Sequence, residues 1–420
     1  MTLSGIISTE LFSQLFFIMG GGVFAFLLSF VGTFGVITIS RKLGWLDRST
    51  VERRRIHKVP VPRLGGVAIF LAFVVASLVF YTLDAEVTAA EIVRYWLLLA
   101  AATLIVLVHI YDDIKGLKPL PKFIAQTVAV IIILGPFGTQ FHGVLFFGFS
   151  NPFGIPGTQG SSLVPWYRWP ELTLFIHNPD ITLMAIPAVL FTWFWIVAMM
   201  NTVNFIDGVD GLATGVAAIT GLFITIICLT LKQPQYSIAV LSAIFTGAVL
   251  GFLPHNWNPA KIFMGDTGSQ FLGLCLAVLS VIGGAKVALV LMLLGIPILD
   301  VVIVVVTRLR RGRSVAQHDT TSHLHYRLLA AGLTARQICY VFYGLTLVFG
   351  VLALEFPRIY KLIGIALVII TMAALSIWID YRQRMRGVSA QPTTQELKEE
   401  TLGEPSQDLS QADKAEGRAR

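Results

Sequence analysis

Four clusters of carboxylate, amide and imidazole residues interrupt a chain that is otherwise strongly apolar. They are His109-Ile-Tyr-Asp112-Asp113, Asn204-Phe-Ile-Asp207-Gly-Val-Asp210-Gly, Phe263-Met-Gly-Asp266-Thr-Gly-Ser and His323-Leu-His325. Adjacent carboxylates such as Asp112 and Asp113 repel each other, so they need a cation or a shared proton to coexist. Mg²⁺ is a hard ion that binds both carboxylates and substrate phosphates. The clusters therefore indicate metal-assisted phosphoryl transfer.

Basic residues near the clusters are candidates for holding phosphate oxygens. Lys115, Lys118 and Lys122 follow the aspartate pair, Lys58 and Arg63 lie in an earlier loop, and Arg327 follows the histidines. The alternative is that these cations only orient the chain in a membrane. A Walker A sequence and an H-E-x-x-H zinc site are both absent, which argues against an ATP bound in a P-loop.

The second and third clusters also have simpler structural readings. Asn204, Asp207 and Gly211 have the spacing of one helix face, with Asp210 on an adjacent face. The neighbouring glycines alone would be typical of close helix packing. Asp266 precedes an apolar run, so it would also serve as a helix N-cap. Phe263 would stack on a base or belong to the interfacial core.

The elements that position these residues are predicted to be transmembrane helices. The chain has 420 residues, of which 55% are hydrophobic and 13% charged, which excludes an ordinary soluble globule. Lipid leaves no partners for unpaired backbone groups, so we expect an all-α polytopic membrane protein. Hydropathy predicts eleven spans, at 12–38, 64–83, 92–110, 121–139, 181–200, 209–231, 236–253, 268–283, 285–307, 337–356 and 359–380.

The distribution of positive charge predicts the orientation of these spans. With the N-terminus outside and the C-terminus in the cytoplasm, the inner segments carry 25 of the 31 Lys and Arg residues. All four clusters then lie at the cytoplasmic face of the cell membrane. The net charge of +7 is explained by this bias, so we do not expect nucleic-acid binding.

The chain divides into a membrane domain, 1–386, and a cytoplasmic tail, 387–420. The tail combines Gln, Glu, Lys, Ser and Pro without apolar periodicity and is predicted to be disordered. The external segment 140–180 is rich in Gly, Pro and aromatic residues, which is compatible with an ordered loop or a short interfacial helix.

The order and content of these motifs resemble the polyprenyl-phosphate N-acetylhexosamine-1-phosphate transferases of glycosyltransferase family 4. That family includes phospho-MurNAc-pentapeptide transferases and GlcNAc-1-phosphate transferases. The resemblance covers about residues 40–340. It is carried by Pro62-Arg63-Leu-Gly65-Gly66, Asp112-Asp113, Lys122 with Gln126, Asn204 to Gly211, Asn256 to Ser269, and His323-Leu-His325.

The resemblance implies a Mg²⁺-dependent reaction, with Mn²⁺ as a substitute, between a UDP-N-acetylhexosamine and a polyprenyl phosphate such as undecaprenyl phosphate. UMP would be released. It assigns catalysis to Asp112, Asp113, Asp266, His323 and His325, and the metal to Asp266 with Asp112 and Asp113. Substrate binding would fall to Lys58, Lys122, Asn204, Asp207, Asp210, Asn256, Phe263 and Arg327. The resemblance also implies a homodimer, and it permits either direct attack by the lipid phosphate or a two-step route through an aspartate.

The histidine motif favours GlcNAc over MurNAc-pentapeptide as the transferred sugar. The sequence His323-Leu-His325-Tyr326 is closer to the His-Ile-His-His form of the GlcNAc group than to a His-His-His run. Tyr326 replaces the final histidine, but it still supplies a hydroxyl for hydrogen bonding. The alternatives are transfer of phospho-MurNAc-pentapeptide and, from another class, an ion-coupled membrane transporter that uses the aspartates as relays.

Overall fold

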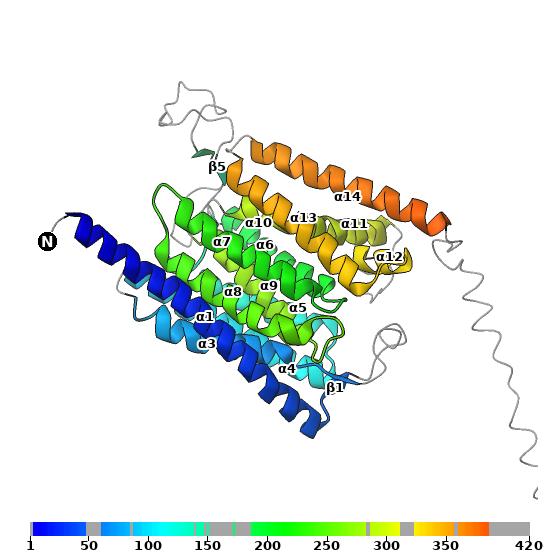
Figure 1. Ribbon diagram of the computed structural model, residues 1–420, viewed down its shortest axis with the longest axis horizontal. Helices are drawn as coiled ribbons and strands as arrows, with labels where there is room; N and C mark the ends of the chain where they lie inside the picture. The colour runs from blue at the N-terminus through cyan, green and yellow to red at the C-terminus, as the bar shows by residue number, and fades with distance from the viewer. Residues whose placement is uncertain are drawn as a thin grey trace, which may run out of the picture.

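Helices dominate the protein in a computed structural model that describes residues 3–47, 60–84, 87–137, 140–146, 149–150, 171–172, 186–282, 286–310, 323–356 and 360–385. Most of the long helices run along a common direction (Figure 1). In chain order they are α1 (Leu3–Leu43), α3 (Gly65–Phe80), α4 (Ala89–Lys115), α5 (Pro119–Leu134), α6 (Ile186–Ile206), α7 (Leu212–Thr230), α8 (Tyr236–Asn256), α9 (Gly265–Val281), α10 (Val287–Leu293), α11 (Gly295–Arg310), α12 (Leu324–Ala330), α13 (Ala335–Glu355) and α14 (Tyr360–Met385).

Each predicted span contains one or two of these helices, which confirms the all-α membrane architecture. Within the described residues, seven helices are long and apolar enough to cross a membrane, and the bent pair α10–α11 would make an eighth. Helices α3 and α5, with 16 residues each, and α9, with 17, are shorter. The count of eleven crossings and the side on which the termini lie therefore stay predictions.

The predicted span 285–307 is not one straight helix. It consists of α10 and α11, which meet at an angle of 77°. The break falls at Leu294-Gly295, and Pro297 lies in the first turn of α11, where its missing N–H costs no helical hydrogen bond. Helix α11 therefore runs in a different direction from α10, and this direction determines the position of Asp300, which lies on α11.

Short antiparallel strand pairs connect some of the helices. Strand β1 (Leu46–Asp47) pairs with β2 (Val61–Pro62), β3 (Pro136–Phe137) with β4 (Gln140–Phe141), and β5 (Phe149–Ser150) with β6 (Glu171–Leu172). Strand β4 and the pair β5–β6 belong to the predicted external segment 140–180, most of which lies outside the described residues. Strand β3 falls instead in the predicted span 121–139, whose helix ends at Leu134. The predicted disordered tail 387–420 lies outside them as well.

Helix α9 is at the centre of the bundle. Every one of its residues except Asp266 is buried, and it packs against α3, α4 and α6. Helices α1 and α14 lie towards opposite edges of the bundle (Figure 1). Glycines let the central helices approach closely: a Cβ on Gly66 of α3 would overlap the backbone of Gly268 in α9. The central position of α9 fixes the location of Asp266, in its first turn.

Helix α8 packs against α1 through a similar backbone contact, and this contact generates a stability prediction. A Cβ on Gly247 would overlap the carbonyl oxygen of Gly22. We expect Gly247→Ala to lower the free energy of unfolding by about 1–3 kcal/mol, because neither backbone can yield without moving a whole helix. Thermal unfolding in detergent measures this. The matched control is Gly35→Ala on α1, where an added Cβ meets nothing within 4 Å; equal midpoints for the two variants would contradict the prediction.

Candidate active site

Three aspartates from two distant parts of the sequence meet at one end of the bundle. Asp112 and Asp113 lie in the last turn of α4, and Asp266 lies in the first turn of α9. The Lys122 ammonium bridges two of them, with Nζ 2.5 Å from Asp112 Oδ2 and 2.8 Å from Asp266 Oδ2. The first and third sequence clusters therefore form one charged site, and Lys122 is its cation.

A tight turn between α4 and α5 brings Lys122 back to the aspartates. Helix α4 ends at Gly116, which has a φ of 77°, a conformation that favours glycine. Asp112 Oδ1 accepts a hydrogen bond from the Leu117 N–H at 2.7 Å, and Pro119 then starts α5. Lys122 consequently lies in the first turn of α5, opposite the carboxylate that ends α4.

Asp113 hydrogen-bonds to the N-terminus of α9. Its carboxylate accepts hydrogen bonds from the backbone N–H groups of Asp266 and Thr267, both at 3.0 Å, and from Thr267 Oγ1 at 2.7 Å. Arg63 Nε lies 3.6 Å from Asp113 Oδ1. The side chain is only 1% exposed. Asp113 thus supplies an N-cap from another helix, and this leaves it less available as a metal ligand than Asp112 or Asp266.

The end of α6 contributes the amide of the second cluster. Asn204 Nδ2 donates to Asp266 Oδ1 at 3.1 Å and to Ser269 Oγ at 2.9 Å. One turn earlier, Asn201 donates to Gln126 Oε1 at 3.2 Å, and Gln126 donates to Gln270 Oε1 at 2.9 Å. This polar layer closes the site on its membrane side and satisfies amides that would otherwise be buried without partners.

The histidine motif is attached to the same end of α6. Phe205, next to Asn204, stacks on the His323 ring at a centroid distance of 5.0 Å, and His323 stacks on His325 at 6.0 Å. Both histidines are buried. Burial, followed by the neighbouring His323, lowers the pKa of His325 to about 3, so this ring is neutral at physiological pH.

Asp210 and Asn256 support the backbone around the site. Asp210 Oδ2 accepts hydrogen bonds from Asn258 Nδ2 at 2.9 Å and from the Ala260 N–H at 3.1 Å. Asn256 Oδ1 accepts from the Gly211 N–H at 3.1 Å and from Thr214 Oγ1 at 2.7 Å. Their predicted substrate contacts stay predictions, because both side chains are already engaged with the turn before α7 and the loop after α8.

The remaining predicted site residues are more scattered. Arg327 donates to Asp380 Oδ1 on α14 at 2.9 Å. Asp207 lies half-buried in the turn after α6, and the Phe263 N–H donates to the Pro62 carbonyl oxygen at 2.8 Å. Lys58 lies outside the described residues, as does the loop before the histidines. The predicted common cleft of Asp112, Asp113, Asp207, Asp266 and His323 is thus supported by contacts at its centre, at Asp112, Asp113 and Asp266.

The aspartates fit a divalent cation only with help from other ligands. No three His, Cys, Asp or Glu side chains in the described ranges are grouped closely enough to hold a metal. Asp112 and Asp266 nevertheless turn one oxygen each toward a single cation, the Lys122 ammonium. That pair suits Mg²⁺, which keeps several waters and is bound by one or two carboxylates together with substrate phosphates.

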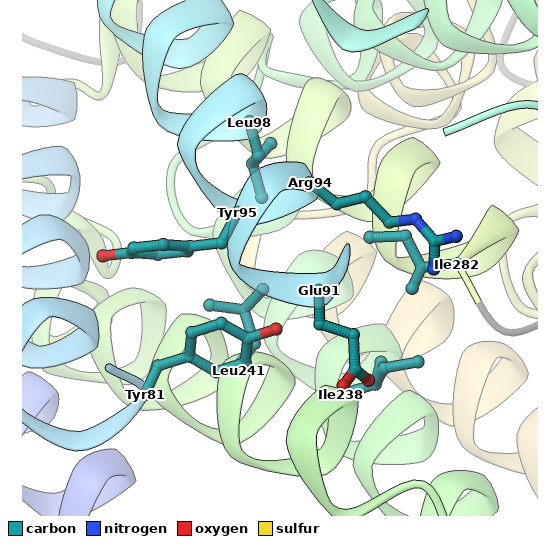
Figure 2. A pocket seen from close by; sticks show the side chains of 8 residues that line it. All are labelled: Tyr81, Glu91, Arg94, Tyr95, Leu98, Ile238, Leu241 and Ile282. Carbon is teal, nitrogen blue, oxygen red and sulfur yellow. The ribbon is translucent and has the colours of Figure 1, made fainter. Parts of the chain in front are cut away.

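A pocket at the other end of α4 is separate from this site. It is lined by Tyr81, Glu91, Arg94, Tyr95, Leu98, Ile238, Leu241 and Ile282 (Figure 2). Glu91 lies in the first turn of α4, whereas Asp112 lies in its last turn. The length of the helix separates the two, so this pocket takes no part in the carboxylate chemistry.

Asp300 is a residue of the site region that the sequence motifs did not identify. It lies on α11 and is 4% exposed, and its Oδ2 lies 2.9 Å from His323 Nδ1, within hydrogen-bonding distance. The sequence does contain an indication of its importance, because Asp300 is the one charged residue in the apolar run between Lys286 and Arg308. An isolated carboxylate in a predicted span marks a candidate functional residue.

Helix α13 braces the turn that holds the second cluster, and this gives a prediction. The Tyr343 hydroxyl donates to the Gly211 carbonyl oxygen at 2.5 Å. We expect Tyr343→Phe to lower the free energy of unfolding by about 1 kcal/mol, because that buried carbonyl loses one of its two hydrogen-bond donors and keeps the Gly215 N–H, at 2.9 Å. Chemical or thermal unfolding measures it. Tyr340→Phe on the same helix is the control, since Tyr340 is 61% exposed; a drop of the same size there would contradict the role given to Tyr343.

Comparison with known proteins identifies the relatives of this chain. The family model for glycosyl transferase family 4 matches residues 95–284, which include Asp112 and Asp266. The chain is 32% identical over 324 residues to the probable undecaprenyl-phosphate N-acetylglucosaminyl 1-phosphate transferase of Bacillus subtilis, covering 75% of this chain and 78% of that protein.

Two further relatives have related names. The decaprenyl-phosphate N-acetylglucosaminephosphotransferase of Mycobacterium tuberculosis is 31% identical over 347 residues, covering 77% of this chain and 78% of that protein. The phospho-N-acetylmuramoyl-pentapeptide-transferase of Geobacillus thermodenitrificans is 32% identical over 324 residues, covering 74% of this chain and 89% of that protein.

Proposed function

Because this chain belongs to glycosyl transferase family 4, we propose that it transfers N-acetylglucosamine 1-phosphate from UDP-N-acetylglucosamine to a polyprenyl phosphate. The observation that carries the proposal is the Asp112–Lys122–Asp266 cluster. Two carboxylates and an ammonium at the end of a membrane bundle suit a diphosphate and its counter-cation. The products are polyprenyl-diphospho-N-acetylglucosamine and UMP.

The bond changes follow from the substrates. An oxygen of the lipid phosphate attacks the phosphorus that carries the sugar, and the bond from that phosphorus to the oxygen of the UMP phosphate breaks. A phosphate monoester has a second pKa near 6, so the attacking oxygen is already largely deprotonated at pH 7. The cluster therefore has to position two anions and offset their repulsion more than it has to remove a proton. A two-step route through Asp113 is disfavoured, because its oxygens are engaged by the α9 N-terminus.

Asp112 and Asp266 are the residues that would hold Mg²⁺ in this proposal. A bound Mg²⁺ would withdraw charge from the diphosphate oxygens. Lys122 lies within reach of both carboxylates and would turn to the phosphates when another cation replaces it there. Asn204 orients Asp266 from the opposite side through its hydrogen bond at 3.1 Å.

The proposed topology places this site at the cytoplasmic face. The eleven helical segments would each cross the membrane, with α10 and α11 together forming one broken span. The positive-inside distribution of Lys and Arg favours an outer N-terminus. The donor, a charged nucleotide sugar, would then reach the site from the cytoplasm and the lipid phosphate from the membrane. A homodimer is part of the proposal on the resemblance alone.

A MurNAc-pentapeptide donor is the second candidate. A relative named as a phospho-N-acetylmuramoyl-pentapeptide-transferase matches this chain, and the match covers 89% of the relative's length. The His323-Leu-His325-Tyr326 sequence favours GlcNAc. A comparison of the two donors at equal concentration separates the candidates.

The proposed reaction predicts lipid-dependent UMP release. Purified protein given undecaprenyl phosphate, Mg²⁺ and UDP-N-acetylglucosamine should release UMP, and Asp112→Asn and Asp266→Asn should each lower kcat by roughly 100-fold or more, because each removes a charge from the cluster. Glu355→Gln is the control, because Glu355 is an exposed carboxylate at the C-terminal end of α13. Turnover of the MurNAc-pentapeptide donor alone would replace the proposed donor, and folded protein that uses neither donor would refute the transferase function.

A further inference from the structure

Asp300 is a buried carboxylate to which the proposed reaction assigns no task. It lies on α11, the second half of the bent pair, and is 4% exposed. Burying a carboxylate is costly unless its oxygens are hydrogen-bonded. The groups that satisfy Asp300 therefore indicate why it is tolerated there.

Both oxygens of Asp300 are taken by the start of the histidine motif. Oδ2 lies 2.9 Å from His323 Nδ1, and Oδ1 accepts a hydrogen bond from the Leu324 N–H at 2.9 Å. An ionised carboxylate can only accept hydrogen bonds. The hydrogen between Asp300 and His323 must then sit on Nδ1, which leaves Nε2 as the ring nitrogen available to another partner.

The rings around His323 fix its plane. Phe205 stacks on it with an interplanar angle of 23°, and His325 stacks on it with an angle of 8°. No hydrogen-bond partner of Nε2 is found in the described part of the chain. Phe205 follows Asn204, whose side chain donates to Asp266, so the His323 ring is attached to the end of the bundle that carries the aspartates.

We propose that Asp300 is a positioning residue that holds His323 in its Nδ1–H form, so that Nε2 accepts a hydrogen from the bound substrate. A carboxylate that orients an imidazole in this way selects both its tautomer and its plane. The reaction served rests on the proposed function, whereas the tautomer does not. The hydrogen received at Nε2 belongs to a hydroxyl or amide N–H of the nucleotide-sugar donor.

The tautomer can be measured without any activity. In full-length protein labelled with ¹⁵N-histidine and held in detergent, NMR distinguishes Nδ1–H from Nε2–H, and His323→Gln identifies the His323 signals among the eight histidines. We expect Nδ1–H in the wild-type protein. In Asp300→Asn the amide oxygen can still accept from Leu324 while the amide nitrogen donates to Nδ1, so the ring should switch to Nε2–H. Nε2–H in the wild-type protein would overturn the inference.

Kinetics then test whether the tautomer matters. Asp300→Asn should lower kcat/KM for the donor roughly 10- to 100-fold with an unchanged unfolding midpoint. In the His323→Gln background the same substitution should cost less than about twofold, because its effect passes through the ring. An equal loss in both backgrounds would show that Asp300 acts independently of His323 and would overturn the inference. Glu355→Gln again controls for the loss of one carboxylate.

The two hypotheses fail in different ways. A wild-type protein that shows Nδ1–H but turns over no donor would refute the proposed function and leave the geometry of Asp300 and His323 intact. An active wild-type protein whose Asp300→Asn variant switches tautomer without losing kcat/KM would refute the role of Asp300 and leave the transferase function intact.

Discussion

The structure depends on holding three carboxylates together at the end of a membrane bundle. Asp112, Asp113 and Asp266 repel one another, and desolvation adds to the cost. The chain offsets this with one ammonium, from Lys122, and with the N-terminal N–H groups of α9, which bind Asp113. These contacts join α4, α5 and α9 at a single point. The contacts that offset the repulsion between the carboxylates therefore also hold the central helices together.

The end of α6 extends this arrangement to the histidine motif. Asn204 hydrogen-bonds Asp266, and the next residue, Phe205, stacks on His323. Two adjacent side chains thus connect the carboxylates with a loop that follows them by more than 50 residues in sequence. Helix α11, which follows the bend, adds a further contact, because it carries Asp300, whose Oδ2 lies 2.9 Å from the Nδ1 atom of the His323 ring. The bent pair α10–α11 therefore also supplies a hydrogen-bonding partner of the histidine motif.

Hydropathy and charge predicted the helical segments and the meeting of Asp112, Asp113 and Asp266, because every cluster falls where its span reaches the same predicted face of the membrane. Sequence spacing did not reveal what each polar side chain contacts. Asp210 and Asn256 looked like substrate ligands, yet their oxygens are bound to backbone N–H groups and neighbouring side chains. Asp300 was missed because it stands alone in an apolar run, and its partner His323 comes only after the helix has ended. Such pairings depend on the bend at Gly295, which hydropathy does not specify.

The charge balance at the centre of the site is compatible with the role proposed for Lys122, which would contact the carboxylates in the free protein and the phosphates in the substrate-bound protein. Asp112 and Asp266 carry two negative charges against the single positive charge of Lys122, so the cluster retains a net negative charge that would repel a diphosphate. If Asp112 and Asp266 held a divalent cation, the same cluster would become net positive and the ammonium would be free to turn toward the phosphates. Under the proposed function, attraction for the donor would then depend on the metal. This coupling requires the lysine to be mobile while the aspartates stay fixed, and the hydrogen bonds of Leu117 to Asp112 and of Asn204 to Asp266 fix them.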